Sequence, residues 1–308
     1  MHHAAALATL ALAPAALAQV DLIITDLPDV FHKGVVGGVH GYAVGFTVCN
    51  AGDQHAAWQS QSSQHPVELW GMYRLADGRL EQVGVSWCKH GNFAASTPGC
   101  GPCDTNINGS RLGVGCKDTY DAAFNSSSFG LGARSDVNPA TGVFPFPADL
   151  SGYPAATPTI GRRIQVAVAD VDPSQNPGAR YFADSQYVAA DEASFGNGAN
   201  SASYREFTVA PGTFNWTAIS ATRRTLPAVY AWQEADPSVR IEPVEIPGEG
   251  TLLLASRVAP AAGGLWRYTY ALQNINSDLA VAGLSLPFSP CAGAPAAACS
   301  LPQYHSGE

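Results

Sequence analysis

The chain has 308 residues and a mass of 32.1 kDa, enough for two domains of ordinary size. Its hydrophobic content of 46% and charged content of 13% allow a sizeable core and argue against a disordered protein. The formal net charge of −9 argues against a nucleic-acid-binding protein, which would need a basic face. Glycine (31) and proline (22) are plentiful and helical periodicity is scarce, so the sequence favours short strands joined by turns.

The amino terminus has the pattern of a secretory signal peptide over residues 1–18. Its apolar stretch, AAALATLALAPAALAQV, contains an A-x-A cleavage pattern at residues 16–18, so the mature chain is expected to begin near Gln19. This stretch is too short to span a membrane as a helix. The sequence therefore predicts a secreted or cell-surface protein, extracellular or periplasmic, with no membrane span.

Strands are predicted over residues 20–25, 40–49, 67–75 and 80–87, where apolar residues alternate or run together. Between the last two, residues 76–79 (ADGR) carry the D-G signature of a β-hairpin. Residues 88–160 are rich in Gly, Ser, Asn, Pro and Cys and are predicted to form long loops. Such loops are usually functional or held by disulfides. Regular structure is predicted to resume with strands at 162–171 and 203–209.

A first domain is expected to cover residues 19–210 and a second β-rich domain residues 211–308, because turn residues gather at Ala210-Pro211-Gly212. Strands of the second domain are predicted near 251–258 and 265–275. Apolar side chains in the latter strand follow a period of two, which predicts that they form one buried face: Trp266, Tyr268, Tyr270 and Leu272. No closing strand is evident after them, so the second domain is expected to be incomplete.

Seven cysteines suggest disulfides, which are the default in an exported chain: Cys49, Cys88, Cys100, Cys103, Cys116, Cys291 and Cys299. We predict that Cys100, Cys103 and Cys116 are disulfide partners, and that Cys291 and Cys299 can close one small loop. Two alternatives remain open for the first group. The CGPC at 100–103 matches a thioredoxin-type redox tetrapeptide, and the three cysteines with His90 could hold zinc.

Two of the chain's three lysines lie in short stretches that also carry cysteines and other reactive side chains. Lys89 lies in SWCKHGNF (86–93), and Lys117 lies in LGVGCKDTYD (112–121), close to Tyr120. The two stretches indicate either loop chemistry held by disulfides or a site where Lys89 and Tyr120 react with each other.

Residues 20–210 resemble the lysyl oxidase family, the secreted copper- and quinone-dependent amine oxidases. The most specific matching stretch is VGCKDTY (114–120), and the others are DLIITDL (21–27), FTVCNAG (46–52), SSQHPVELWGMYRLADG (62–78), VGVSWCKHG (83–91), IQVAVADVDPS (164–174) and FGNGANSASYREFTV (195–209). The 24 residues between His65 and Lys89 (89 − 65) are close to that family's gap between its last copper histidine and its cofactor lysine. The chain is also similar to uncharacterised exported bacterial proteins with S-W-x-K-H-G and L-G-x-G-C motifs.

The resemblance implies that residues 19–210 form a lysyl-oxidase-like β-sandwich with long disulfide-bearing loops. Together with the strands predicted after residue 210, the expected fold is mainly β, with a second, incomplete β-sandwich following the first. It implies copper and a lysine tyrosylquinone cofactor formed from Lys89 and Tyr120. The quinone would form a Schiff base with a primary amine, and Asp118 would remove the α-proton, with Asp121 as its rival. His65 would be a copper ligand, and the candidates for further ligands are His90, His55 and His40.

The sequence departs from the family at its copper site. Gln61 and Ser63 occupy positions where the family's H-x-H-x-H arrangement has histidines, and only His65 remains. We therefore expect an extracellular or cell-surface binding or structural module without catalytic activity, whose partner would be an extracellular protein, an amine or a polysaccharide. The alternative is a copper-dependent amine oxidase or another metal-assisted oxidase. The joint match of Lys89 and Tyr120 to the family's cofactor pair predicts that they lie within reach of each other, on neighbouring strands or strand ends, with His65 nearby.

Overall fold

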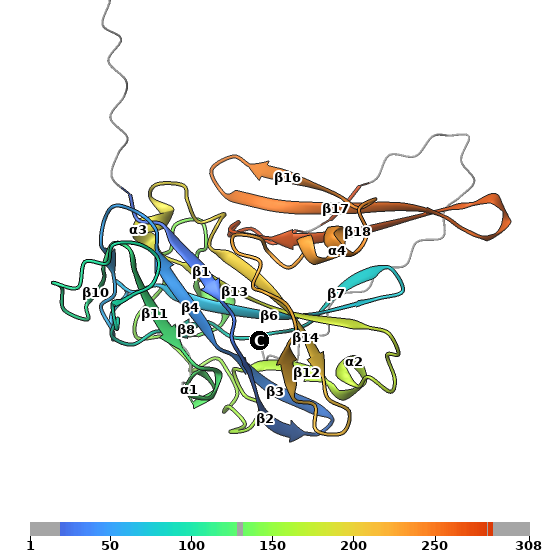
Figure 1. Cartoon of the computed structure of the whole chain (residues 1–308), viewed down its shortest axis with the longest axis horizontal. Helices are drawn as coiled ribbons and strands as arrows, with labels where there is room; N and C mark the ends of the chain where they lie inside the picture. The colour runs from blue at the N-terminus through green and yellow to red at the C-terminus, as the bar shows by residue number, and fades with distance from the viewer. Residues whose placement is uncertain (1–18, 128–131, 282, 286–308) are drawn as a thin grey trace, which may run out of the picture.

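The computed structural model describes residues 19–127, 132–281 and 283–285. The expected signal peptide, Cys291 and Cys299 lie outside the described residues. The chain is mainly β, with 42% of residues in strands and 10% in helices, as predicted (Figure 1).

A six-stranded antiparallel sheet occupies the middle of the molecule (Figure 1). Its strands lie in the order β15 (Trp216–Ala218), β14 (Ala202–Val209), β13 (Arg180–Val188), β6 (Val67–Ala76) and β7 (Arg79–Val85), and β8 (Lys89–His90) also pairs with β6. The predicted hairpin is confirmed: Asp77 and Gly78 both have positive φ, 51° and 71°, as the turn between β6 and β7 requires. Because β15 pairs with β14, the first sheet continues past residue 210.

Two smaller sheets lie against one face of this central sheet. One has the order β1 (Leu22–Asp26), β4 (Phe46–Asn50), β11 (Cys116–Tyr120) and β9 (Thr97–Pro98), and the other β12 (Ile164–Ala167), β3 (Val39–Val44) and β2 (Val30–Val36). A two-stranded ribbon joins β5 (Ala56–Ala57) to β10 (Arg111–Leu112). The strand predicted over 40–49 is therefore wrong in one respect, since it divides at Gly45 into β3 and β4, which belong to different sheets. A Cβ at Gly45 would lie 2.8 Å from the backbone nitrogen of Ala122 and would also collide with the Asp29 carboxyl, so this break favours glycine.

The region predicted as loops, 88–160, contains short elements. Besides β8 to β11, they are helix α1 (Ala122–Ser127) and the 3-10 turn η1 (Arg134–Asp136). The strand predicted over 162–171 ends at Ala167, where helix α2 (Val168–Val171) begins, and a third short helix, α3 (Ala190–Ala193), follows β13. These helices are too short for an apolar periodicity to be read from the sequence.

Both faces of the central sheet are covered, because alternate residues of its strands enter different cores. On β6, Trp70 and Met72 pack into the main core with the two smaller sheets, whereas Tyr73 and Leu75 enter a second core on the opposite face. A third, smaller cluster covers the end of the sheet where β6 begins: Val67, Cys88, Val137, Phe144 and Val188.

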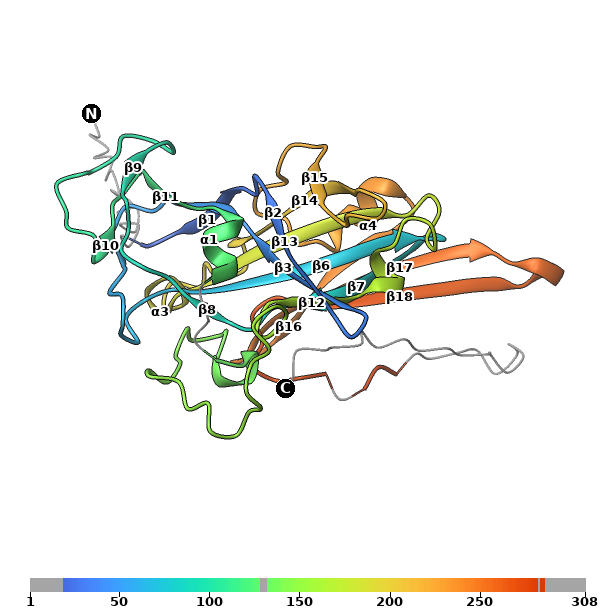
Figure 2. The same ribbon diagram turned by 90° about the horizontal axis from the view of Figure 1, so that it is seen from below.

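The carboxy-terminal part of the described chain closes the second core. Helix α4 (Tyr230–Ala235) lies beside a three-stranded sheet of β16 (Arg240–Ile246), β17 (Gly250–Pro260) and β18 (Trp266–Asn274); the 3-10 turn η2 (Ala262–Gly264) joins the last two strands. Trp232, Leu253 and Ala255 pack in this core with Tyr73 and Phe182 of the central sheet. Both views show the β17–β18 hairpin extending beyond the rest of the molecule (Figures 1 and 2).

The apolar stripe of β18 does not form the buried face that was predicted. Trp266, Tyr268 and Leu272 are 61%, 53% and 38% exposed. The residues that face the second core are the intervening ones, Ala271 and Gln273, because they lie opposite the buried Ala255 and Leu253 of β17. Alternation in a strand thus identified two faces correctly, but the more apolar face is the one turned away from the core.

Candidate functional site

The candidate site is a buried polar cluster inside the main core, and Glu68 is at its centre. Glu68 continues the row of Trp70 and Met72 on β6, so strand alternation directs it into the core. Its register partners are Lys89 on β8 and Tyr187 on β13, on either side. The sheet therefore places a carboxyl, an amine and a phenol in one row.

Both oxygens of the Glu68 carboxyl are engaged by these neighbours. The Lys89 Nζ lies 3.2 Å from Oε2, and the Tyr187 hydroxyl donates to Oε1 at 2.7 Å. The pair is removed from water, because the side chains of Lys89 and Glu68 are only 3% and 0% exposed. A charge pair at this depth is strongly destabilised when one partner is lost.

Tyr120 and Asp118 reach the cluster from the facing sheet. They alternate with exposed or half-buried residues on β11, so both point into the core. The Lys89 Nζ lies 4.5 Å from the centroid of the Tyr120 ring and 5.6 Å from that of Phe124 on α1. The expected proximity of Lys89 and Tyr120 is thus found, but the two residues belong to facing sheets and not to neighbouring strands.

Of the two candidate bases, only Asp118 belongs to this cluster. Its Oδ1 accepts the backbone N–H groups of Ala95 and Thr119, both at 3.1 Å, while its buried Oδ2 has no hydrogen-bond partner among the described residues. Asp121 is exposed, and its carboxylate accepts the N–H of Phe124 at 2.7 Å at the start of α1. Asp121 therefore has the role of a helix cap.

The electrostatics of the cluster favour uncharged groups. Burial raises the pKa of Glu68 against the opposing effects of Lys89 and the Tyr187 hydroxyl, and it raises the pKa of Asp118 against the Tyr120 hydroxyl and two backbone N–H groups. Burial also raises the pKa of Tyr120, and the nearby Asp118 and Glu68 raise it further. The single Lys89 ammonium faces two buried carboxyls, those of Glu68 and Asp118. The cluster is therefore least costly when one of these two carboxyls is protonated.

His65 and His90 lie beside the cluster, with ring centroids 4.4 Å apart. The ring nitrogens of His65 are 2.8 Å and 2.9 Å from the carbonyl oxygens of Pro66 and Asn92, and those of His90 are 3.1 Å and 2.7 Å from the carbonyl oxygens of Gly91 and Ser62. Burial lowers the pKa of His65 to about 4 and also lowers that of His90. Gly91 permits this packing, because a Cβ there would collide with the His65 ring.

The arrangement does not fit the copper site that the resemblance implies. Each ring nitrogen of His65 and His90 already faces a backbone carbonyl, and no group of three His, Cys, Asp or Glu in the described part of the chain could hold a metal ion. His40 and His55 do not complete the site. His40 contacts His32 at 2.8 Å, and His55 contacts the Asp104 carboxylate at 3.0 Å.

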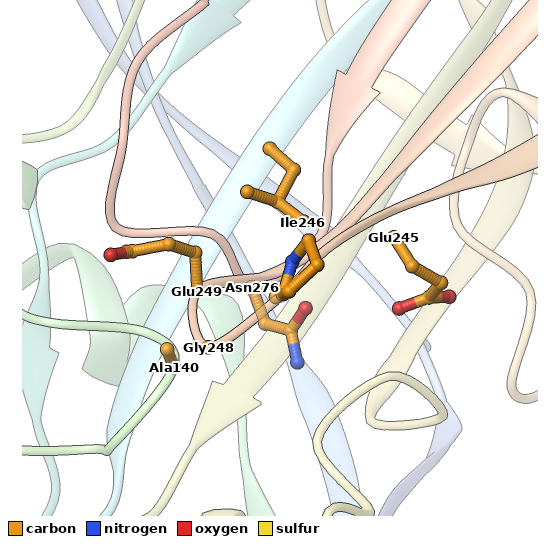
Figure 3. Close-up of a pocket in the computed structure, with 8 residues that line it drawn as sticks. Ala140, Glu245, Ile246, Gly248, Glu249 and Asn276 are labelled. Atoms are coloured by element: carbon orange, nitrogen blue, oxygen red, sulfur yellow. The ribbon is translucent and has the colours of Figure 1, made fainter.

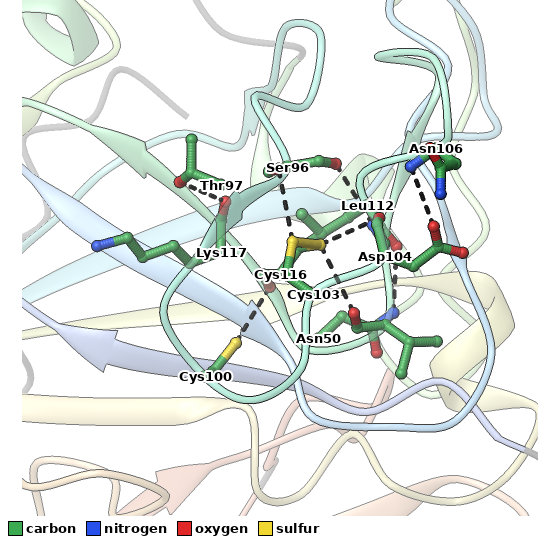
Figure 4. Close-up of a disulfide and its surroundings, with 12 residues drawn as sticks. Asn50, Ser96, Thr97, Cys100, Cys103, Asp104, Asn106, Leu112, Cys116 and Lys117 are labelled. Atoms are coloured by element: carbon green, nitrogen blue, oxygen red, sulfur yellow. Dashed lines mark hydrogen bonds between the residues drawn. A yellow bond between two sulfur atoms is a disulfide. The ribbon is translucent and has the colours of Figure 1, made fainter.

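Two disulfides confirm the prediction for the loop cysteines. Cys49 on β4 is bonded to Cys100. Cys103 is bonded to Cys116 on β11 (Figure 4). Cys100 and Cys103 have different partners, so the CGPC stretch does not form a redox disulfide of its own, and the three sulfurs are not zinc ligands. The bonds anchor the 97–116 loop to the sheet that carries Asp118 and Tyr120.

A shallow hollow of about 310 Å³ lies at the turn between β16 and β17 and is formed by none of the predicted site residues (Figure 3). Its lining includes Glu245 and Glu249, which extend to opposite sides of the turn, and Asn276. The Asn276 side chain accepts the backbone N–H of Thr251 at 2.8 Å, so it is already used in holding the turn.

Sequence reasoning missed Glu68, Tyr187 and Trp58. Trp58 donates from Nε1 to the Tyr120 hydroxyl at 3.4 Å. A signal for Glu68 existed: it is a lone acidic residue in the stretch VELWGMY, with the same parity as Trp70 and Met72. The contribution of Tyr187 depends on the pairing of β13 with β6, which joins segments more than 100 residues apart, and no local pattern predicts it.

No family model matches the chain, and neither the curated proteins nor the solved structures include a match to it. No helix in the described residues is long and apolar enough to cross a membrane.

Proposed function

We propose that this chain is an exported module of the cell exterior, binding or structural, that has a fold like the lysyl oxidase β-sandwich and no copper catalysis. The observation that carries the proposal is the engagement of Lys89. Its amine is held against a fully buried carboxyl, inside a core, and the histidines beside it face backbone carbonyls. Such an amine stabilises the junction of two sheets and is closed to a substrate from solution.

Export is supported by the signal-peptide pattern of residues 1–18 and by the two disulfides, which persist in oxidising compartments. The partner would be an extracellular protein, an amine or a polysaccharide. The second β-rich segment offers an exposed apolar sheet face for such contacts.

One observation favours the alternative, a copper-dependent amine oxidase or another metal-assisted oxidase. The Lys89 Nζ lies 4.5 Å from the Tyr120 ring centroid. A small movement would bring the amine to the separation of roughly 3–3.5 Å that atoms must reach before they bond. If copper were bound, it would supply, together with dioxygen, the oxidation of the tyrosine ring to a quinone. In this chain Lys89 would supply the amine, Asp118 would hold the proton, and Trp58 would orient the Tyr120 hydroxyl.

The two functions are separated by metal analysis and by a quinone assay on the secreted protein. We expect purified protein, incubated with copper(II) in air, to bind less than one equivalent of copper and to give no quinone absorbance or redox-cycling stain. Tyr120→Phe is the matched control, because it removes the phenol and keeps the ring. Stoichiometric copper with a quinone signal that Tyr120→Phe abolishes would establish the oxidase.

A further inference from the structure

The contact between Lys89 and Glu68 has the components of an amide-forming site. Lys89 and Glu68 are direct register partners on adjacent strands, and Lys89 Nζ lies 3.2 Å from Glu68 Oε2 in a site from which water is excluded. Fixed proximity of this kind replaces a bimolecular encounter by a unimolecular one. The aromatic rings of Tyr120 and Phe124 enclose the amine on its other side.

We propose that Lys89 and Glu68 form an intramolecular isopeptide bond after folding, so that β6 and β8 become covalently joined. A bond forms between Lys89 Nζ and Glu68 Cδ, and the bond between Cδ and Oε2 breaks. Oε2 leaves as water with two protons that the amine and the carboxyl release. The reaction consumes no oxidant and no cofactor, and the chain loses the mass of one water molecule.

The neighbouring groups are suited to each step of this reaction. Transfer of a proton from the ammonium to the carboxylate gives an amine and a carboxylic acid, which are the reactive forms. Burial raises the pKa of Glu68 and so favours the protonated carboxyl. The Tyr187 hydroxyl donates to Oε1 at 2.7 Å, so it can stabilise negative charge on that oxygen when the amine attacks.

Asp118 can carry the proton between the attacking amine and the leaving oxygen. Its carboxyl interacts electrostatically with both Lys89 and Glu68, and its Oδ2 is buried without a hydrogen-bond partner among the described residues. A proton accepted from the amine and returned to Oε2 restores Asp118 to its initial state.

This inference goes beyond the proposed structural role, and the two can fail separately. An uncrosslinked Glu68–Lys89 ion pair would still join β6 and β8, and the quinone assay tests the oxidase independently.

Mass spectrometry of the folded protein tests the bond directly. After prolonged incubation at neutral pH, we expect the reduced, denatured chain to be lighter than its sequence by one water. Trypsin should then fail to cleave at Lys89, and it should yield residues 34–74 joined to residues 80–111. Full mass with complete cleavage at Lys89 would overturn the proposal.

Variants distinguish this bond from other losses of water. Glu68→Gln should form the same bond and lose ammonia in place of water, while Lys89→Arg should retain its full mass. Asp118→Asn should crosslink at least tenfold more slowly than wild type while circular dichroism shows the native fold. Lys33→Arg, which changes an exposed lysine on β2, should crosslink normally. A loss of water that persists in Lys89→Arg would assign the bond elsewhere and refute the proposal.

Discussion

Glu68 and Lys89 face each other directly across β6 and β8, and neither side chain is more than 3% exposed. This relationship links the central sheet to the sheet that carries Tyr120, since the same amine lies over the Tyr120 ring. A buried carboxyl is tolerated here because an ammonium and a phenol satisfy its two oxygens.

Replacing Lys89 by Met should therefore be strongly destabilising. The change leaves the Glu68 carboxyl buried without its cation, and we expect the free energy of unfolding to fall by about 3–5 kcal/mol. Lys33→Met, at an exposed position, should change it by less than about 0.5 kcal/mol. Urea unfolding followed by tryptophan fluorescence measures both. Adding Glu68→Gln to Lys89→Met should recover part of the loss, and a double variant no better than the single one would argue against a charge effect.

The sequence predicted the elements of this site better than it predicted their assembly. Alternation located the strand of Glu68, and the composition of residues 88–160 indicated a disulfide-held loop, but the strand of Tyr120 lies inside this stretch that was predicted as loops. The sequence could not show that the strands of Glu68 and Tyr120 lie in facing sheets, because pairing between distant segments is set by the packing of the whole core. The division of residues 40–49 at Gly45 has the same cause, and so does the inward orientation of the half-buried Gln273 in place of Trp266.

Glu192 should make stability depend on pH. It is fully buried, its Oε1 accepts the N–H of Leu22 at 2.7 Å, and burial raises its pKa from 4.5 to about 8. Between these values the folded state holds a proton that the unfolded state has released, so stability falls as pH rises from 4.5 to about 8, by at most about 1.4 kcal/mol per pH unit. Glu192→Gln should flatten this slope in urea titrations, whereas Glu242→Gln on the exposed β16 should not. Identical slopes in all three proteins would contradict the assignment.

His65 should give a slope of the opposite sign at lower pH. Its folded pKa, about 4, lies below the ordinary value of 6.5, so the unfolded state binds a proton first as the solution is acidified. Stability is then lost as pH falls from 6.5 to about 4. We expect His65→Asn to remove this acid sensitivity even if it lowers stability at neutral pH. Introducing His65→Asn into Glu192→Gln separates the pH dependence of His65 from that of Glu192. If the double variant His65→Asn/Glu192→Gln loses stability in acid as steeply as Glu192→Gln alone, another group is responsible.

The Cys103–Cys116 bond closes a short loop, with a sequence separation of 13 residues. Cys103→Ser/Cys116→Ser should lower the free energy of unfolding by about 2–4 kcal/mol, mainly because the unfolded chain regains freedom. Peptide mapping of the non-reduced protein should first show the two pairings, Cys49 with Cys100 and Cys103 with Cys116. Thermal unfolding of the double variant then gives the cost. A variant as stable as wild type would show that the loop is held by its other contacts.

The domain boundary expected near residue 210 has a consequence for truncation. A fragment of residues 20–210 lacks β15, which pairs with β14, and lacks the helix and sheet that cover Tyr73 and Phe182. Limited proteolysis should cut between about residues 211 and 247, and we expect the resulting fragment to retain β structure by circular dichroism but to bind a hydrophobic dye. A fragment without β structure would indicate one intertwined domain.

The two faces of the β16–β18 sheet should respond very differently to substitution. Trp266 and Tyr268 are 61% and 53% exposed, so Trp266→Thr and Tyr268→Thr should each change the free energy of unfolding by less than about 0.5 kcal/mol. Trp232 on α4 is 1% exposed in the second core, and Trp232→Ala should cost about 3–5 kcal/mol. Urea unfolding of the three variants measures the contrast. A loss above about 2 kcal/mol for Trp266→Thr would show that this face is covered in the native protein, because only a buried tryptophan carries that much packing energy.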